Sequence, residues 1–362
     1  MKKTKRGSLI AFAIALAMVA SGCAGGNAGS KSSGTNSSQS GSGAASASQS
    51  NSAAWKPTSS FKAFIGYGAG GSTDNVVRPL FTAFEKIAGQ NVTVENLSGA
   101  SGSISFANAC EAAADGYNLI VSAEAACLYD AYEVIDYCIK DVQPLLIVGS
   151  MDNTLYVRAD SPYQTVKELF DAELANPGSI LKTASGTMGV NATLSAMFKH
   201  LVGVDFKAYT ADSGTSAIVT VLGGFADWGI SSLGNLEDYV ENGDVRELCT
   251  LTTERIDENV PAITEFYPEM APYLPLDPFY TISVSKDCPP EVVSYLSETL
   301  KQAWETPNYQ DAMEAYNIQL LGLSGSDADQ YIEDWRQSAF SSLGGAGVIS
   351  VEKIESLGYT VG

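Results

Sequence analysis

Short loops of glycine, serine and threonine recur along this chain, each between an apolar run and a helical pattern. The first reads YGAGGSTD at residues 67–74, and the second reads ENLSGASGS at residues 95–103. Small residues leave the backbone N–H groups of a loop accessible, and the N-terminus of the helix that follows adds a partial positive charge. Such loops can hold an anionic group such as a carboxylate.

Three further loops have the same character: ASGTMG at 184–189, TADSGTS at 210–216 and SSLGN at 231–235. One helix N-terminus contributes about 0.3 to 2 kcal/mol toward binding an anion, whereas micromolar affinity requires about 8 kcal/mol. Several loops must therefore act together on one ligand. For any single loop, turns and helix caps explain the small residues equally well.

The segments around these loops alternate between strand and helix. A strand is expected at 61–66, followed by a helix that Ser72 or Thr73 can cap and that has Asp74 in its first turn. The apolar face of this helix consists of Val76, Val77, Leu80, Phe81 and Phe84. A second helix is expected at 104–114, before a strand at 118–121.

The second half of the chain repeats the alternation. A strand at 180–183 precedes a helix that begins at Val190, and a strand at 204–209 precedes a helix whose inward-facing residues are expected to be Ile218, Val219 and Leu222. Another short strand is expected at 228–230. Alternating strands and helices indicate an α/β fold, in which ligands bind beyond the carboxyl ends of the strands.

Motifs for cofactor, metal or nucleophilic chemistry are missing from the sequence. It contains no phosphate-binding GxxxxGK[ST] pattern, and the glycines of the first loop lack the spacing of a dinucleotide fingerprint. The sole histidine, His200, lies in a helical stretch away from the small-residue loops. We therefore expect no catalytic residue, no metal and no cofactor. A hydrolase with a serine–lysine or carboxylate pair stays open as an alternative.

The cysteines do not form a recognisable site. After Cys23 there are five of them, without CxxC spacing, so neither a zinc site nor a dense disulfide framework is expected. They are Cys110, Cys127, Cys138, Cys249 and Cys288. A bridge between Cys127 and Cys138 stays open.

The N-terminus has the pattern of a secretory signal. A basic MKKTKRGS segment precedes LIAFAIALAMVA, an apolar run too short to span a bilayer. The run ends in Ala-Ser-Gly-Cys, which resembles the lipobox of bacterial lipoproteins, with Ala20 where that pattern usually has leucine. Residues 1–22 are predicted to be a lipoprotein signal peptide, and Cys23 the lipidated residue that anchors the protein to the membrane. An ordinary secretory signal is the alternative.

Residues 23–56 are rich in glycine and serine and are predicted to form a flexible tether. The full chain has a formal charge of −20, and removal of residues 1–22 leaves 17 basic against 41 acidic residues, a charge of −24. Nucleic acid is therefore an improbable partner. This net charge does not exclude an anionic ligand, because backbone N–H donors act locally while surface charge is screened beyond about 8 Å.

Seven motifs in order resemble the substrate-binding proteins of tripartite tricarboxylate transporters, the TctC or Bug family, over nearly all of the chain after the tether. They are AGGSTDNVVR at 69–78, VENLSGASGSIS at 94–105, ADGYNLI at 114–120, TVKELFDAELANPGSI at 165–180, ASGTMG at 184–189, YTADSGTSAIVTVLGGFADWGISSL at 209–233 and VRELCTLTTER at 245–255.

The resemblance implies a two-lobed α/β fold of the type II periplasmic-binding-protein kind, with a hinge between the lobes. Lobe 1 is predicted to comprise residues 57–154 and 281–362, and lobe 2 residues 155–280. It further implies that backbone amides and small hydroxyls hold a ligand carboxylate. The residues that match the family's site are Gly70, Gly71, Ser72, Thr73, Asp74, Ser185, Gly186, Thr187, Gly189, Ser213 and Gly214, with Ser231 and Ser232 as secondary candidates.

The function that the resemblance implies is that of an extracytoplasmic solute-binding protein, not an enzyme. It would capture a mono-, di- or tricarboxylate between its lobes and deliver it to integral membrane transporter subunits, acting as a monomer. A lipoprotein that presents its ligand to a signalling partner would have the same features, so a sensor is the alternative.

Two residues depart from the family pattern. Ala69 replaces the usual proline of the first loop, and Glu124 follows the strand at 118–121 at a position that faces the expected cleft. A carboxylate there would repel an anion or recognise an amino group or another cation. Alternatively, Glu124 points to solvent or caps a helix, and the sequence leaves these possibilities open.

Overall fold

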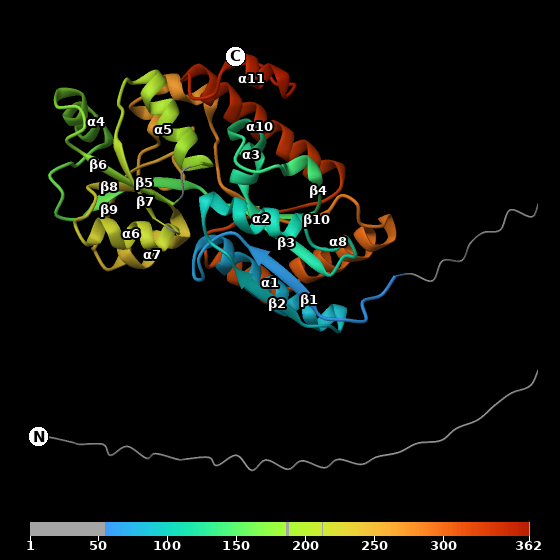
Figure 1. Ribbon diagram of the computed structural model, residues 1–362. Helices are drawn as coiled ribbons and strands as arrows, with labels where there is room; N and C mark the ends of the chain where they lie inside the picture. Colours follow the sequence, from blue (N-terminus) through green and yellow to red (C-terminus); the bar gives the residue numbers. More distant parts are fainter. Residues whose placement is uncertain (1–54, 186–187, 212, 362) are drawn as a thin grey trace, which may run out of the picture. The chain divides into compact units, whose positions relative to one another are not determined.

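The computed structural model describes residues 55–185, 188–211 and 213–361 (Figure 1). The predicted signal peptide, the lipidation site Cys23, nearly all of the tether, Gly186 and Thr187 lie outside the described residues. Within the described part, no helix is long and apolar enough to cross a membrane. The five cysteines after Cys23 are free thiols in the structure, so Cys127 and Cys138 form no bridge there.

The first sheet has six strands among the described residues, in the order β11-β4-β10-β3-β1-β2. Their bounds are β1 Phe61–Ile65, β2 Val92–Asn96, β3 Asn118–Ala123, β4 Val142–Ser150, β10 Phe279–Ser285 and β11 Gln319–Leu323. β1 is parallel to β2 and β3, whereas β10 is antiparallel to β3 and β4. The carboxyl ends of β1 and β3 therefore meet at one edge, where the first loop and Glu124 follow.

Helices cover both faces of this sheet because its central strands are apolar on both sides. In β1, Ala63 and Ile65 pack into one buried cluster with Leu80 of α1, whereas Phe64 faces a second cluster with Phe106 of α2. The helices that accompany this sheet are α1 Ser72–Ala88, α2 Ser103–Cys110, α3 Tyr129–Tyr132, α8 Pro290–Trp304, α9 Pro307–Glu314, α10 Ser326–Gly345 and α11 Val351–Ser356.

The predicted apolar face of α1 is confirmed, since all five of its residues are buried. The predicted cap is wrong, because Gly71 is the N-cap and the helix already begins at Ser72. Asp74 lies in the first turn as expected. The second helix ends at Cys110 rather than at residue 114, and Gly116 makes the turn into β3 with a positive φ of 86°.

The second sheet has five strands among the described residues, in the order β7-β6-β8-β5-β9. Their bounds are β5 Asn153–Arg158, β6 Leu181–Ser185, β7 Lys207–Ala211, β8 Trp228–Ser232 and β9 Val245–Thr250. β6 is parallel to β7 and β8, so the carboxyl ends of these three strands meet at one edge. The helices are α4 Val166–Ala175, α5 Val190–Leu201, α6 Gly214–Leu222 and α7 Leu233–Glu241. Figure 1 shows α6 and α7 on one face of this sheet and α4 and α5 on the other.

Two details of the second sheet differ from the expectation. The strand expected at 204–209 lies at Lys207–Ala211, and Val219 is 55% exposed. The buried residues of α6 are Ala217, Ile218 and Val221. A helix turns by about 100° per residue, so a face centred between residues 217 and 221 leaves residue 219 outside it.

The chain passes between the two sheets where β4 ends at Ser150 and β5 begins at Asn153, and again between β9 and β10. A shared core cluster contains Phe170 and Trp228 together with Phe279 and Trp335. Helix α10 lies beside α5 (Figure 1). The mixed α/β architecture is confirmed, whereas the lobe boundaries at residues 154 and 280 stay a prediction.

Candidate ligand-binding site

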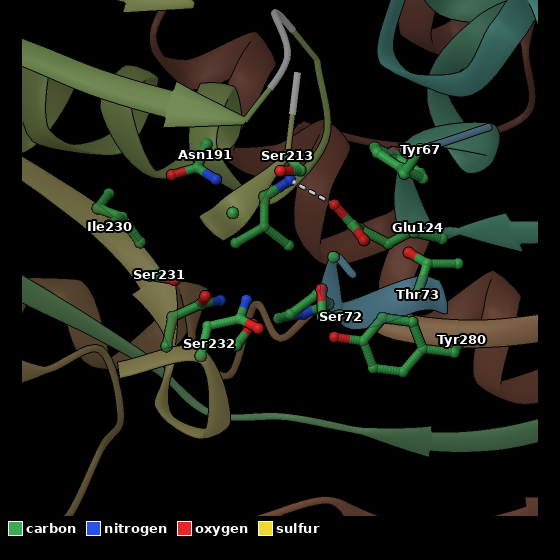
Figure 2. A pocket seen from close by; sticks show the side chains of 17 residues that line it. Tyr67, Ser72, Thr73, Glu124, Asn191, Ser213, Ile230, Ser231, Ser232 and Tyr280 are labelled. Atoms are coloured by element: carbon green, nitrogen blue, oxygen red, sulfur yellow. Dashed lines mark hydrogen bonds between the residues drawn. The ribbon is translucent and has the colours of Figure 1, made fainter. Parts of the chain in front are cut away.

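A small cavity lies where the loop ends of the two sheets meet, and residues from both sheets line it (Figure 2). Its volume is about 50 Å³. Hydroxyl groups dominate its polar lining, from Tyr67, Ser72, Thr73, Ser213, Ser231, Ser232 and Tyr280. Three asparagines, Asn153, Asn191 and Asn235, also line it. Within the described residues, no lysine or arginine lines this cavity.

The N-termini of four helices converge on the cavity. Gly71, Ser72 and Thr73 belong to the start of α1, and Val190 and Asn191 to the start of α5. Ser213 is the N-cap of α6, and Ser232 is the N-cap of α7. Since the positive ends of four helices point to one place, the cavity has the electrostatics of an anion site.

Small residues allow the loops of the two sheets to approach closely here. A side chain at Gly71 would place its Cβ 3.3 Å from the Cβ of Ser213. Ser213 itself is fixed by a reciprocal cap, in which its hydroxyl accepts the Ser216 N–H at 3.2 Å and the Ser216 hydroxyl accepts the Ser213 N–H at 2.9 Å. The Thr215 hydroxyl also donates to the carbonyl oxygen of Gly70 at 3.2 Å.

The structure brings together about half of the site residues predicted from the sequence. The lining contains Gly71, Ser72, Thr73, Ser213, Gly214, Ser231 and Ser232. Gly70, Asp74 and Gly189 are described but do not line the cavity. The side chain of Ser185 and all of Gly186 and Thr187 lie outside what the structure describes, so their part in a site stays a prediction.

Asp74 supports the first loop instead of facing the cavity. Its carboxylate accepts hydrogen bonds from the Gly70 N–H at 3.0 Å, Arg78 Nε at 2.8 Å and Asn96 Nδ2 at 3.0 Å. Although burial acts to raise it, these hydrogen bonds and the charge of Arg78 hold the pKa of Asp74 below its ordinary value. Asp74 therefore fixes the position of the residues around Gly71.

We expect Asp74→Asn to lower the free energy of unfolding by about 1 to 3 kcal/mol at pH 7, because the buried acceptor network loses its charge. A depressed pKa stabilises the fold above the unfolded pKa, so the difference from the wild type should shrink as pH falls through 4. Urea unfolding at pH 7 and pH 3.5 measures both effects. The matched control is Asp171→Asn, since Asp171 pairs with Lys167 on an exposed face of α4. This substitution should lower the free energy of unfolding by less than about 1 kcal/mol. Equal losses in the two variants would contradict the prediction.

Glu124 faces the cavity and does not point to solvent, since it is only 7% exposed. Its Oε1 accepts the N–H of Val190 at 3.0 Å, the dashed contact in Figure 2, so it satisfies one backbone donor at the N-terminus of α5, a helix of the other sheet. Burial raises the pKa of Glu124 to about 7. Gly189, at φ 82°, makes room for this carboxylate, because a Cβ there would lie 2.5 Å from Glu124 Oε1.

Several residues that line the cavity were not predicted from the sequence. Tyr67 and Asn235 are two of them, and their position inside the small-residue loops is the sequence feature that could have identified them. Asn153 begins β5 and Tyr280 lies in β10, so both belong to segments where the chain enters a sheet. Neither has a motif around it, and only the packing of the two sheets places it at the cavity. The Nδ2 of Asn153 and the Oγ of Ser231 are buried without a hydrogen-bond partner among the described residues.

Comparison with known proteins agrees with this architecture. The family model described as the tripartite tricarboxylate transporter family receptor, TctC, matches residues 76–340. Protein BugT of Bordetella pertussis is 24% identical over 271 residues, which are 73% of this chain and 82% of BugT.

Two solved structures share the fold. R. palustris Rpa4515 with adipate has a TM-score of 0.74 at 21% identity, with 80% of this chain and 98% of that chain covered. MatC from Rhodopseudomonas palustris with bound malate has a TM-score of 0.72 at 18% identity, with 78% of this chain and 99% of that chain covered. The two-lobed fold of periplasmic binding proteins is thereby confirmed for this chain. Because the family model matches most of its length, the chain belongs to the TctC family of tripartite tricarboxylate transporter receptors.

Proposed function

We propose that this protein is an extracytoplasmic solute-binding lipoprotein that captures a small organic ligand through a carboxylate group between its two lobes. It delivers this ligand to the integral membrane subunits of a tripartite tricarboxylate transporter. Cys23 anchors it to the membrane, and residues 23–56 give the binding unit its reach. The lipobox-like end of the N-terminal apolar run supports the anchor, and family membership supports the transporter.

The observation that carries the proposal is the convergence of four helix N-termini from two sheets on one hydroxyl-lined cavity. A carboxylate accepts several hydrogen bonds at once, and backbone N–H groups and serine hydroxyls supply them without a cationic side chain. Each helix end adds about 0.3 to 2 kcal/mol. The ends of α1, α6 and α7 together supply at most about 6 kcal/mol, so hydrogen bonds from the lining hydroxyls must add the rest of the about 8 kcal/mol that micromolar binding of a small anion requires.

The size of the cavity supports capture by closure. A volume of about 50 Å³ corresponds to only about three to five water molecules, at roughly 10 to 15 Å³ each. An organic acid therefore enters only when the two loop edges separate, and the described conformation corresponds to a closed one. Such closure around a ligand is the usual behaviour of hinged two-lobed proteins.

The solved relatives support the ligand class. Rpa4515 holds adipate and MatC holds malate, and both ligands are small dicarboxylates. A ligand of the same chemistry is proposed here, with its carboxylate at the N-termini of α1, α6 and α7.

An enzymatic role has little support in the cavity. Lys182 is buried beside α5 and donates hydrogen bonds to the hydroxyl of Ser195 and to the carbonyl oxygen of Asn191. Burial lowers the pKa of Lys182 to about 8. A serine–lysine pair is a known type of nucleophile and base in hydrolases. Neither Ser195 nor Lys182 lines the cavity, however. His200 is exposed on α5 and does not line it either. We therefore assign binding and no chemistry to the site.

The proposal is tested by the thermal stability of the purified protein with propionate, succinate, malate, adipate, citrate, alanine, aspartate, glutamate and glucose. A compound at 100 times its Kd should add about 2.7 kcal/mol to the free energy of unfolding. At least one compound with a carboxylate should raise the unfolding temperature, and glucose should not. A shift with glucose alone, or with no compound, would contradict carboxylate capture.

A further inference from the structure

Glu124 is the one charged side chain among the described residues that line the cavity. It lies at the start of the segment Glu124–Leu128, directly after β3, and its side chain is more than nine-tenths buried. In Figure 2 it extends toward the cavity from the side opposite to Ser231 and Ser232. A site for a plain dicarboxylate would gain nothing from an ionised acid at this position, because like charges repel at short range.

Within residues 55–185, 188–211 and 213–361, no lysine or arginine lines the cavity beside this carboxylate. Its described hydrogen bond comes from the Val190 N–H at 3.0 Å. The titratable groups that face it are the hydroxyls of Tyr67, Tyr129 and Tyr280 and the thiol of Cys127. Burial raises the pKa of each of these groups, so they remain neutral at physiological pH. An ionised Glu124 is therefore a buried charge that no described lysine or arginine of the cavity balances, and a cationic group on the ligand would balance it.

Glu124 also changes which helix ends are open to a ligand anion. Because its Oε1 accepts the first N–H of α5, that helix end already has a carboxylate at one of its backbone donors. The N-termini of α1, α6 and α7 remain directed at the cavity, through Ser72, Ser213 and Asn235. The site thus has an anion-binding side and an acidic side.

We infer that the ligand carries an ammonium group beside its carboxylate, and that Glu124 recognises this ammonium group. The ligand class is then a free amino acid or another short amino carboxylate. The inference rests on the proposed function and narrows its ligand class. Its carboxylate lies at the N-termini of α1, α6 and α7, and its ammonium group pairs with Glu124 in a site closed to water, where a charge-assisted hydrogen bond is strong.

A competing explanation makes the opposite prediction. Glu124 could act as an internal stand-in for the ligand's carboxylate, held at α5 until an external carboxylate displaces it. In that case, neutralising Glu124 would strengthen the binding of carboxylates, because the competitor is lost. If Glu124 pairs with an ammonium group, neutralising it weakens the binding of amino compounds.

The test is isothermal titration calorimetry with three matched pairs of compounds: aspartate and succinate, glutamate and glutarate, alanine and propionate. The two members of each pair differ by one amino group. For at least one pair, the wild type should bind the amino member at least about 10-fold more tightly at pH 8. Glu124→Gln should weaken that binding by about 100-fold, the usual result of removing one partner of a buried charge pair. Glu111→Gln, which changes an exposed glutamate, should leave it unchanged.

The pH dependence gives a readout that needs no variant. Glu124 must be ionised to pair with an ammonium group, and burial raises its pKa to about 7 in the free protein. The affinity of the wild type for the amino compound should therefore rise about 10-fold from pH 6 to pH 8 and then level off. The ammonium group of a free amino acid and the tyrosines around Glu124 do not titrate in this range. The pH effect should disappear in Glu124→Gln.

Three results separate the explanations. Equal or tighter binding of succinate, glutarate and propionate than of their amino partners would overturn the inference and leave carboxylate capture intact. An unchanged or tighter affinity of Glu124→Gln for the amino compound would likewise overturn the inference and leave carboxylate capture intact. If no compound of any pair binds the wild type, the inference fails, and the proposed function fails with it only if malate, adipate and citrate do not bind either. Thermal unfolding of Glu124→Gln without ligand verifies its fold, since a glutamine Oε1 can still accept the Val190 N–H.

Discussion

Replacing Gly71 with leucine is expected to weaken ligand binding at least about 100-fold while the protein stays folded. Gly71 is the N-cap of α1 and has a φ of −76°, a backbone conformation that any residue adopts. Its Cβ position lies 3.3 Å from the Cβ of Ser213 and 3.2 Å from the carbonyl oxygen of Gly68. The remaining carbons of a leucine would fill the space between the first loop and α6. The two loop edges could then not close on a ligand, and closure provides most of the contacts.

The measurement is the affinity for whichever carboxylate or amino acid gives the largest thermal shift, together with the unfolding temperature of the free protein. Ala69→Leu is the matched control, because Ala69 is an exposed residue of the same loop and the substitution introduces the same side chain. It should bind normally. Normal binding by Gly71→Leu would mean that the first loop does not form a wall of the site.

Replacing Arg336 with methionine is expected to lower the free energy of unfolding by about 3 to 5 kcal/mol, the usual loss when one partner of a buried ion pair is removed. Arg336 is fully buried in α10 and donates hydrogen bonds to Asp130 Oδ2 at 2.7 Å and to the hydroxyl of Tyr359 at 2.7 Å. Although burial acts to lower it, the hydrogen bond and charge of Asp130 raise the pKa of Arg336, which stays ionised. Methionine fills much of the same volume but leaves the Asp130 carboxylate without its partner.

Arg336 also connects α10 to the segment that begins with Glu124. It donates to the carbonyl oxygen of Cys127, within the segment Glu124–Leu128 that begins with Glu124. Urea unfolding measures the stability loss, and ligand titration of the folded variant shows whether the segment keeps its position. Arg255→Met is the control, because Arg255 pairs with Glu265 at the surface, where the two side chains are 43% and 41% exposed. Loss of this pair should lower the free energy of unfolding by less than about 1 kcal/mol. A loss below 1 kcal/mol for Arg336→Met would contradict the buried-pair argument.

The sequence determined the class of fold and the location of the loops that build the site. Periodicity identified the buried face of α1 because those residues repeat at helical spacing within one segment. Small-residue loops after strands marked the helix N-termini at Gly71 and Ser213, since parallel strands place their carboxyl ends at a common edge. Both signals are local in the chain, so a sequence contains them.

The tertiary structure decided what each polar residue does within those loops. Asp74 and Ser72 are two residues apart, yet one supports the loop and the other lines the cavity, because successive helical residues point about 100° apart. Asn153 and Tyr280 reach the cavity from strands without a motif. The direction of Glu124 depends on Val190, which is 66 residues away in the sequence and begins a helix of the other sheet. Contacts of this kind follow from how the two sheets pack, and no local pattern encodes them.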